Sequence, residues 1–152
     1  MNSSTATSSR FVFPVPTRPE GEARRVVGTW RLIRSEVPPE IRQFRGEQPT
    51  GFIHYDANGY MSVQIVPDRD RGMFPTYSPT AEQALNAILG YAAYFGTYSV
   101  DLNEMTITHH RACSLTTLKS VDIVRRFELR GDNQIVLKPK ESSNILIWER
   151  LT

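Results

Sequence analysis

Hydrophobic and polar residues alternate in short runs along most of the chain, a pattern typical of β-strands that bury one face. Eight runs are predicted to be strands, covering residues 26–36, 52–56, 60–66, 95–100, 105–110, 121–129, 134–137 and 145–151. Asn58-Gly59 predicts a tight hairpin, because this pair adopts positive φ at little cost. Residues 101–104 and 130–133 are predicted to be hairpin turns as well.

Strands with mostly local connections point to one architecture. About eight such strands can close into an antiparallel barrel, which leaves no exposed sheet edge. The pattern therefore predicts an all-β fold, an eight-stranded antiparallel up-and-down β-barrel. A barrel of this size is filled by side chains or holds one small ligand.

One segment has helical rather than strand periodicity. Thr80 and Gln83 have the spacing of a capping box, in which each side chain bonds the backbone of the other residue. The apolar residues that follow fall on one stripe at helical spacing: Ala84, Leu85, Ile88, Leu89 and Ala92. This predicts one mid-chain amphipathic helix of about three turns. Its stripe is expected to pack on one end of the barrel.

The chain of 152 residues is long enough for one domain with a substantial core. Residues 1–24 are rich in Ser, Thr and Pro and predict a disordered or loosely attached tail, followed by a barrel domain over residues 25–152. Phe11, Val12 and Phe13 are the exceptions, since they could cover an apolar patch or a barrel mouth.

Charge and hydropathy narrow the range of partners. A net charge of +2 gives no field strong enough to predict nucleic acid or an anionic membrane as a partner. No segment has the roughly 20 apolar residues of a membrane helix, and residues 1–10 lack the apolar core of a secretory signal. Cys113 is the only cysteine, which excludes an internal disulfide and favours the cytoplasm.

Six sequence motifs in order resemble one known family. They are VGTWRL at 27–32, YDANGYMS at 55–62, GYAAYFGTY at 90–98, THH at 108–110, RRFEL at 125–129 and WERL at 148–151. Together they resemble the small lipocalin-like domain family of bacteria and fungi, over residues 26–152. The first motif is similar to the Gly-x-Trp opening of lipocalins.

The resemblance implies a lipocalin-like barrel with a central cavity. It also implies structural roles for Gly28, Trp30 and Arg150, with the arginine stacked on the tryptophan at the closed end of the barrel. Some lipocalin-like relatives act in natural-product pathways as cyclases, isomerases or dehydratases. Secreted lipocalins differ from this chain, which lacks their disulfide and carries its helix mid-chain, so transport of extracellular hydrophobic molecules is not expected.

Alternation on two predicted strands places an arginine and a histidine inside the barrel. Arg125 shares a face with Ile123 and Phe127, and His109 shares a face with Ile107. A buried guanidinium cannot lose its proton, so it could hold a ligand carboxylate, phenolate or enolate. His109 could donate a hydrogen bond or shuttle a proton. The alternative is structural: Arg125 pairs with an internal acid, and His109 bonds a tyrosine or a carbonyl.

Aromatic residues complete the predicted cavity. Tyr94 and Tyr98 share the bulkier face of their strand and are placed inward, where an apolar ring with a polar tip suits ligand binding. Further ligand-binding candidates are Tyr55, Gln64, Phe127 and Trp148. No metal site is predicted, because adjacent strand residues such as His109 and His110 point apart. No cofactor motif is present.

Three functions remain open. The first is a barrel that binds a small hydrophobic or amphipathic molecule, with an anionic or oxygenated end oriented by Arg125. The second is a metal-free and cofactor-free cyclase, isomerase or dehydratase that acts on a polyketide- or terpenoid-like intermediate, with His109 or Tyr98 moving a proton. The third is a domain with a filled interior that serves assembly. A homodimer is compatible with each.

Overall fold

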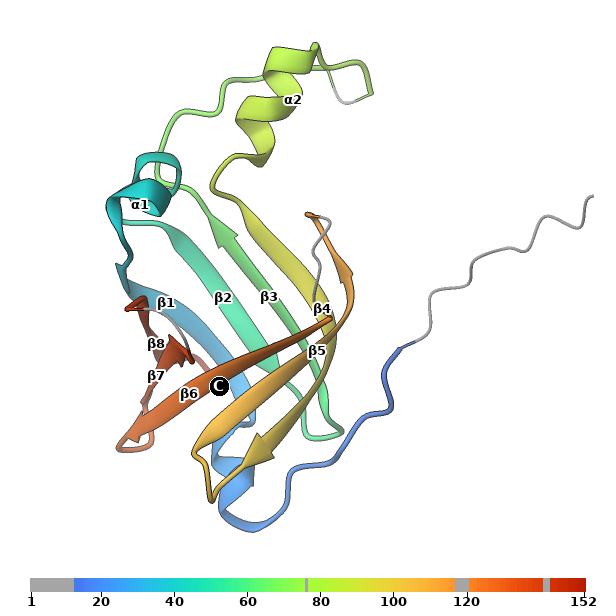
Figure 1. The fold of residues 1–152 in the computed structure, drawn as a ribbon, viewed down its shortest axis with the longest axis vertical. Helices are drawn as coiled ribbons and strands as arrows, with labels where there is room; N and C mark the ends of the chain where they lie inside the picture. The colour runs from blue at the N-terminus through green and yellow to red at the C-terminus, as the bar shows by residue number, and fades with distance from the viewer. Residues whose placement is uncertain (1–12, 76, 117–120, 141–142) are drawn as a thin grey trace, which may run out of the picture.

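The computed structural model describes residues 13–75, 77–116, 121–140 and 143–152. Within these residues, eight antiparallel strands pair in chain order, and the eighth closes on the first (Figure 1). The predicted all-β, up-and-down barrel is confirmed. The strands are β1 (Gly28–Glu36), β2 (Thr50–Tyr55), β3 (Tyr60–Val66), β4 (Ala92–Asp101), β5 (Thr106–Ser114), β6 (Asp122–Arg130), β7 (Gln134–Pro139) and β8 (Ile145–Arg150).

The hairpin between β2 and β3 forms as the sequence predicts. Gly59 has a φ of 98°, and the Asp56 carboxylate accepts hydrogen bonds from the backbone N–H groups of Asn58 and Tyr60. The local sequence therefore fixes the register in which Tyr55 faces Met61.

Strands β4 and β5 are longer than predicted, because they continue past a β-bulge. The register shifts between Phe95 and Gly96, which pair with Cys113 and Arg111. A Cβ on Gly96 would lie 2.0 Å from the carbonyl oxygen of His110, so the two backbones approach closely only with glycine there. Across a bulge the alternation of inward and outward residues changes phase, so a pattern of period two does not predict the part of the strand beyond it.

The core lies inside the barrel. Its buried apolar residues come from all eight strands and from the segment before β1, and they include Val26, Trp30, Ile53, Tyr55, Val63, Tyr98, Ile107, Phe127, Ile135 and Trp148. His109 is buried among them at 1% exposure.

One end of the barrel is closed by a short 3-10 helix, η1 (Gly21–Val26), which buries Ala23 and Val26. The Trp30 indole donates a 2.9 Å hydrogen bond to the carbonyl of Val26, and the Arg150 guanidinium carbon lies 4.0 Å from the centroid of the Trp30 ring. Arg150 also donates to the carbonyls of Arg25, Val27 and Asp132. A single charged side chain thus joins η1 to the barrel wall.

Gly28 leaves the space in which the Arg150 side chain and the end of the chain lie. Its φ is 144°, and a Cβ there would lie 2.2 Å from the Thr152 carbonyl oxygen and 2.6 Å from Arg150 Nη1. Any larger residue at this position would push apart the contacts that close this end.

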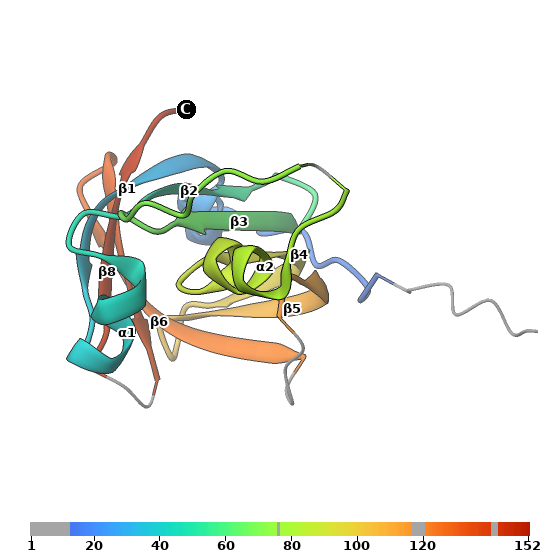
Figure 2. The same ribbon diagram turned by 90° about the horizontal axis from the view of Figure 1, so that it is seen from above.

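Two helices lie at the opposite end, α1 (Pro39–Arg45) and α2 (Ala81–Ile88), as Figure 1 shows, and Figure 2 gives the view from above onto them. The alternation pattern does not reveal α1, although Pro39 and Glu40 are residues typical of a helix start. The capping box of Thr80 and Gln83 forms as predicted. However, α2 has only eight residues, and it is shorter than predicted because it ends before Gly90, which has a φ of 78°.

The expectation that the apolar stripe of α2 packs on the barrel is wrong. No residue of α2 is buried, and Leu85 and Ile88 are 56% and 41% exposed. The helix is held instead by its C-terminal carbonyls: Arg69 donates hydrogen bonds to Asn86 and Leu89, and Arg71 donates one to Ala87. Cationic side chains at a helix C-terminus also stabilise it electrostatically.

Arg69 also links α2 to α1, since its Nε donates a 2.9 Å hydrogen bond to the Phe44 carbonyl. Gly90 lies beside the same point, because a Cβ on it would meet that carbonyl oxygen at 2.3 Å. The Nε of Arg45 donates a 3.3 Å hydrogen bond to the Gly90 carbonyl. These contacts fix the position of Arg45 at this end of the barrel.

Residues before η1 lie along the outer wall. The Phe13 ring packs against Tyr60 and Phe95, with centroid distances of 5.7 Å to each. The backbone of Thr17 passes so close to Gly59 that a Cβ there would lie 2.6 Å from the Thr17 carbonyl oxygen. Phe13 therefore covers an apolar patch, while Phe11 and Val12 lie outside the described residues. In the described part of the chain, no helix is long and apolar enough to cross a membrane.

Candidate functional site

A cavity of about 120 Å³ lies inside the barrel near the end that carries the helices. Apolar side chains of several strands form most of its wall, with Ile53, Val63, Ile65, Leu137 and Leu146 among them. The polar side chains in its described lining are Arg45, Tyr94, His109, Arg125, Asn144 and Trp148. An apolar hollow with a few convergent polar groups is typical of a small-molecule site.

His109 lies at the centre of a hydrogen-bonded chain across the barrel. Its Nε2 is 2.7 Å from the hydroxyl oxygen of Tyr55, and its Nδ1 is 2.8 Å from that of Tyr94. Strands β2, β4 and β5 supply the three residues, so barrel closure is what brings them together. Both ring nitrogens are thus engaged by tyrosines.

The imidazole of His109 is neutral at neutral pH. Burial first, and then the positive charge of Arg125, lower the pKa of His109 to about 3. A neutral imidazole carries one N–H donor and one acceptor nitrogen. One tyrosine therefore donates to His109, and the other accepts from it.

Arg125 enters the cavity from β6, as the alternation predicts. It pairs across the ladder with Ile107, two residues from His109, and it lies close enough to Tyr94 to influence the pKa of that hydroxyl. Burial raises the pKa of Tyr94, and Arg125 opposes this rise through its charge. Tyr94 therefore remains a neutral hydroxyl that lies beside a cation.

Arg45, at the end of α1, is a second cation in the cavity lining and one that the sequence pattern does not reveal. Burial, followed by the charge of Arg125, lowers the pKa of Arg45, which shows that the two guanidinium groups repel each other. No Asp or Glu is among the described residues that line the cavity. Two cations that face one hollow, with no carboxylate in its described lining, favour an anionic ligand.

Trp148 adds a donor without a partner. It is 1% exposed and lines the cavity, and its indole Nε1 has no hydrogen-bond partner among the described residues. Buried indole N–H groups normally have a partner, and one left over beside a cavity is a place for a ligand oxygen or a water molecule.

The other predicted site residues lie elsewhere. Tyr55 contacts His109 but is not part of the cavity lining, and Phe127 is buried in the core away from it. The Tyr98 hydroxyl donates a 2.6 Å hydrogen bond to the Asp56 carbonyl, also outside the lining. Gln64 is exposed on the outer face of β3.

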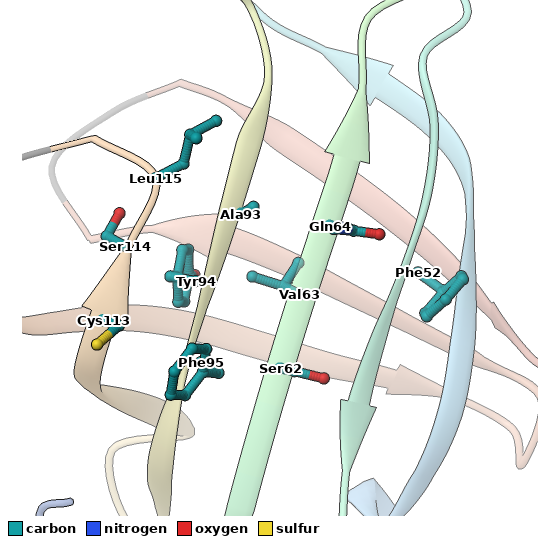
Figure 3. A pocket seen from close by; sticks show the side chains of 10 residues that line it. All are labelled: Phe52, Ser62, Val63, Gln64, Ala93, Tyr94, Phe95, Cys113, Ser114 and Leu115. Carbon is teal, nitrogen blue, oxygen red and sulfur yellow. The ribbon is translucent and has the colours of Figure 1, made fainter. Parts of the chain in front are cut away.

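A larger apolar groove of about 460 Å³ lies on the outer wall (Figure 3). It spans β2 to β5, and its lining includes Phe52, Gln64, Phe95 and Cys113. No charged side chain belongs to its described lining, and Phe13 packs on Phe95 at its edge. The groove therefore offers apolar area and a few neutral polar side chains but no charged group in its described lining, whereas the interior cavity has charged donors, which makes the cavity the stronger candidate.

A closed eight-stranded barrel with a polar group inside fits the family that the sequence motifs resemble. The family model described as "Lipocalin-like domain" matches residues 27–151. The chain belongs to this lipocalin-like domain family. No curated protein matches the chain closely enough to suggest a ligand or an activity for this lipocalin-like domain.

A metal ion needs a set of protein ligands that lie close together. Within the described residues, no group of three or more His, Cys, Asp or Glu side chains could hold a metal ion. His109 and His110 point to opposite faces of β5, since His110 hydrogen-bonds Ser99 and Asp122 on the outer side. The candidate site consists of side-chain donors and an apolar wall.

Proposed function

We propose that this lipocalin-like domain binds a small amphipathic molecule inside its barrel, with the oxygenated or anionic end of the molecule held by Arg125. The observation that carries the proposal is a guanidinium in an apolar cavity without a carboxylate in the described lining. Arg125 is half-buried, and a cation that is partly withdrawn from water is stabilised by an anion or strong acceptors, which a bound ligand supplies.

The size of the cavity limits the ligand. A volume of about 120 Å³ is close to the roughly 150 Å³ of an apolar protein cavity that accepts benzene. A compact molecule with one polar end fits this space. The volume favours such a ligand over a polyketide- or terpenoid-sized one.

A panel of compact probes tests the proposal. Indole, p-cresol and benzoate are titrated into the isotope-labelled protein, and chemical-shift changes are recorded by NMR. At least one probe is expected to shift residues of the cavity lining, with weaker binding of oxygenated probes to Arg125→Met. Arg126→Met is the matched control, because Arg126 follows on the same strand and is exposed. Shifts confined to the outer wall, or no binding by any probe, would contradict the proposal.

Catalysis is the second candidate function. The chain of hydroxyl and imidazole groups from Tyr55 through His109 to Tyr94 supports it, because such a chain can move a proton to or from a bound molecule. The activity would be that of a metal-free isomerase, cyclase or lyase. Tyr94, which lines the cavity, is better placed than Tyr98 to contact a substrate.

His109→Ala separates binding from catalysis. If His109 takes part in proton transfer, the variant is expected to lose product formation with a candidate substrate while a ligand still binds, provided circular dichroism shows a folded barrel. If the variant forms product at the rate of the unchanged protein, His109 does not take part in proton transfer.

The compartment and the oligomeric state are also proposals. A single cysteine supports the cytoplasm, where thiols stay reduced. A homodimer is tested by sedimentation velocity at several protein concentrations. A sedimentation coefficient that does not change with concentration and matches 17.3 kDa would contradict it.

A further inference from the structure

We propose that the polar end of the ligand is a carboxylate, which receives hydrogen bonds from Tyr94 and Arg125, and that His109 directs the Tyr94 hydroxyl proton toward it by carrying its own proton on Nδ1. This inference rests on the proposed function and deepens it by naming the chemical class of the ligand.

The hydrogen bonds of Tyr55 decide the tautomer of His109. Tyr55 is fully buried and outside the cavity lining, and within the described residues its hydroxyl contacts only His109 Nε2. If Nε2 carried the proton, the Tyr55 hydroxyl would accept it and would keep a buried O–H without an acceptor. If Nδ1 carries the proton, Tyr55 donates to Nε2 and no buried donor is left over.

The same choice sets the direction of the Tyr94 hydroxyl. With the proton on Nδ1, the Tyr94 oxygen accepts a hydrogen bond from His109 at 2.8 Å. Because the oxygen accepts in that direction, its own O–H points away from His109. Because Tyr94 lines the cavity, this O–H is available to a ligand.

The polar side chains around the cavity therefore present donors. They are the Tyr94 hydroxyl, the guanidinium groups of Arg45 and Arg125, and the unpartnered indole N–H of Trp148. Asn144, which also lines the cavity, already has interactions of its own.

Of the common polar ends, a carboxylate matches this set best. It accepts at both oxygens, fits the forked geometry of a guanidinium and offsets the repulsion between the two arginines. An ammonium would be repelled, and a carboxamide carries no charge that could offset the repulsion between the two guanidinium groups.

Benzoate, benzamide and benzyl alcohol test the ligand class, because they share one ring and differ in the polar end. Isothermal titration is expected to show benzoate binding at least about tenfold more tightly than either neutral compound. Tyr94→Phe should weaken benzoate binding about tenfold, because it removes one donor to a charged acceptor. Tyr98→Phe is the matched control and should leave the affinity unchanged, since its hydroxyl bonds Asp56 outside the cavity. Equal affinities for benzoate and benzamide would overturn the assignment.

Nitrogen NMR of ¹⁵N-histidine-labelled protein tests the tautomer without any ligand. The unchanged protein is expected to show His109 protonated on Nδ1, with its Nε2 signal shifted by the hydrogen bond from Tyr55. Tyr55→Phe should remove that hydrogen-bond shift and leave the proton on Nδ1, because an Nε2–H would then be a buried donor without an acceptor. Protonation of His109 on Nε2 in the unchanged protein overturns the inference, whether or not Tyr55→Phe folds.

The two proposals fail in different ways. If indole or p-cresol binds inside the barrel and benzoate does not bind more tightly, the proposed function stands and the carboxylate inference falls. If no probe binds, both the proposed function and the proposed ligand class are contradicted. The nitrogen NMR spectrum still shows which tautomer His109 adopts.

Discussion

At the scale of a single residue, burial inside the barrel changes the protonation and the hydrogen bonding of His109. Burial and a nearby guanidinium keep its imidazole neutral, and two tyrosines use both of its ring nitrogens. Such a histidine orients its neighbours more readily than it exchanges protons with solvent at neutral pH. The residues with free donors beside the cavity, Tyr94 and Trp148, are the ones that can contact a ligand.

The low pKa of His109 predicts a pH-dependent stability. Its pKa is about 3 in the folded protein and near the ordinary histidine value of 6.5 in the unfolded chain, so between these values the unfolded chain binds more protons. The free energy of unfolding is therefore expected to fall with decreasing pH across this window, by up to ~1.4 kcal/mol per unit from this residue. Urea denaturation at pH 4, 5, 6 and 7 measures it. His109→Gln should flatten the slope, and an unchanged slope in that variant would assign the effect to other groups.

Arg150 supports a second prediction at this scale. Replacing it with Met removes the contact with the Trp30 ring and hydrogen bonds to several carbonyls, so the free energy of unfolding should fall by about 2–4 kcal/mol. Chemical denaturation measures this loss. Arg31→Met is the comparison, because its ion pair with Glu149 is exposed and should contribute at most about 1 kcal/mol. Equal losses in the two variants would argue against a special role for Arg150.

Among the elements, the two helices show which features a sequence pattern can predict. The capping box locates the start of α2 because it depends on residues three apart. The fate of its apolar stripe depends on the distance to the barrel, which no local pattern encodes, and Leu85 is in fact exposed. The helix α1 is too short to be predicted from periodicity, so the place of Arg45 beside the cavity could not be predicted either.

Arg69 should decide how firmly α2 is held. Arg69→Ala removes the donors to the C-terminal carbonyls of α1 and α2, so amide exchange over residues 81–89 should become faster. Hydrogen-exchange mass spectrometry measures this change. Leu85→Ser is the control and should leave exchange and stability nearly unchanged, within about 0.5 kcal/mol. If Leu85→Ser increases exchange as much as Arg69→Ala, then the apolar stripe holds the helix instead.

For the whole molecule, the barrel could be predicted and the cavity only in part. Alternation depends on nearest neighbours along the strand, so it places Arg125 and His109 inside correctly. It does not give the register between strands, which brings Tyr55 and Tyr94 onto the two nitrogens of His109. It also cannot separate Phe127 in the packed core from Trp148 at the cavity wall, because both face inward.

Closure of the sheet is what gives these inward residues a shared function. Residues from β2, β4, β5, β6 and β8 meet across a largely apolar interior, where each unpaired polar group is costly. The proposed function therefore requires a ligand in this interior that satisfies the arginine and the tyrosine together.

A crystal structure of the protein grown with benzoate tests this claim most directly. The account predicts benzoate inside the barrel, with its carboxylate within hydrogen-bond distance of Arg125 and the Tyr94 hydroxyl. Benzoate held only in the outer groove, or an Arg125 side chain paired with a carboxylate of the protein itself in place of the ligand, would contradict it.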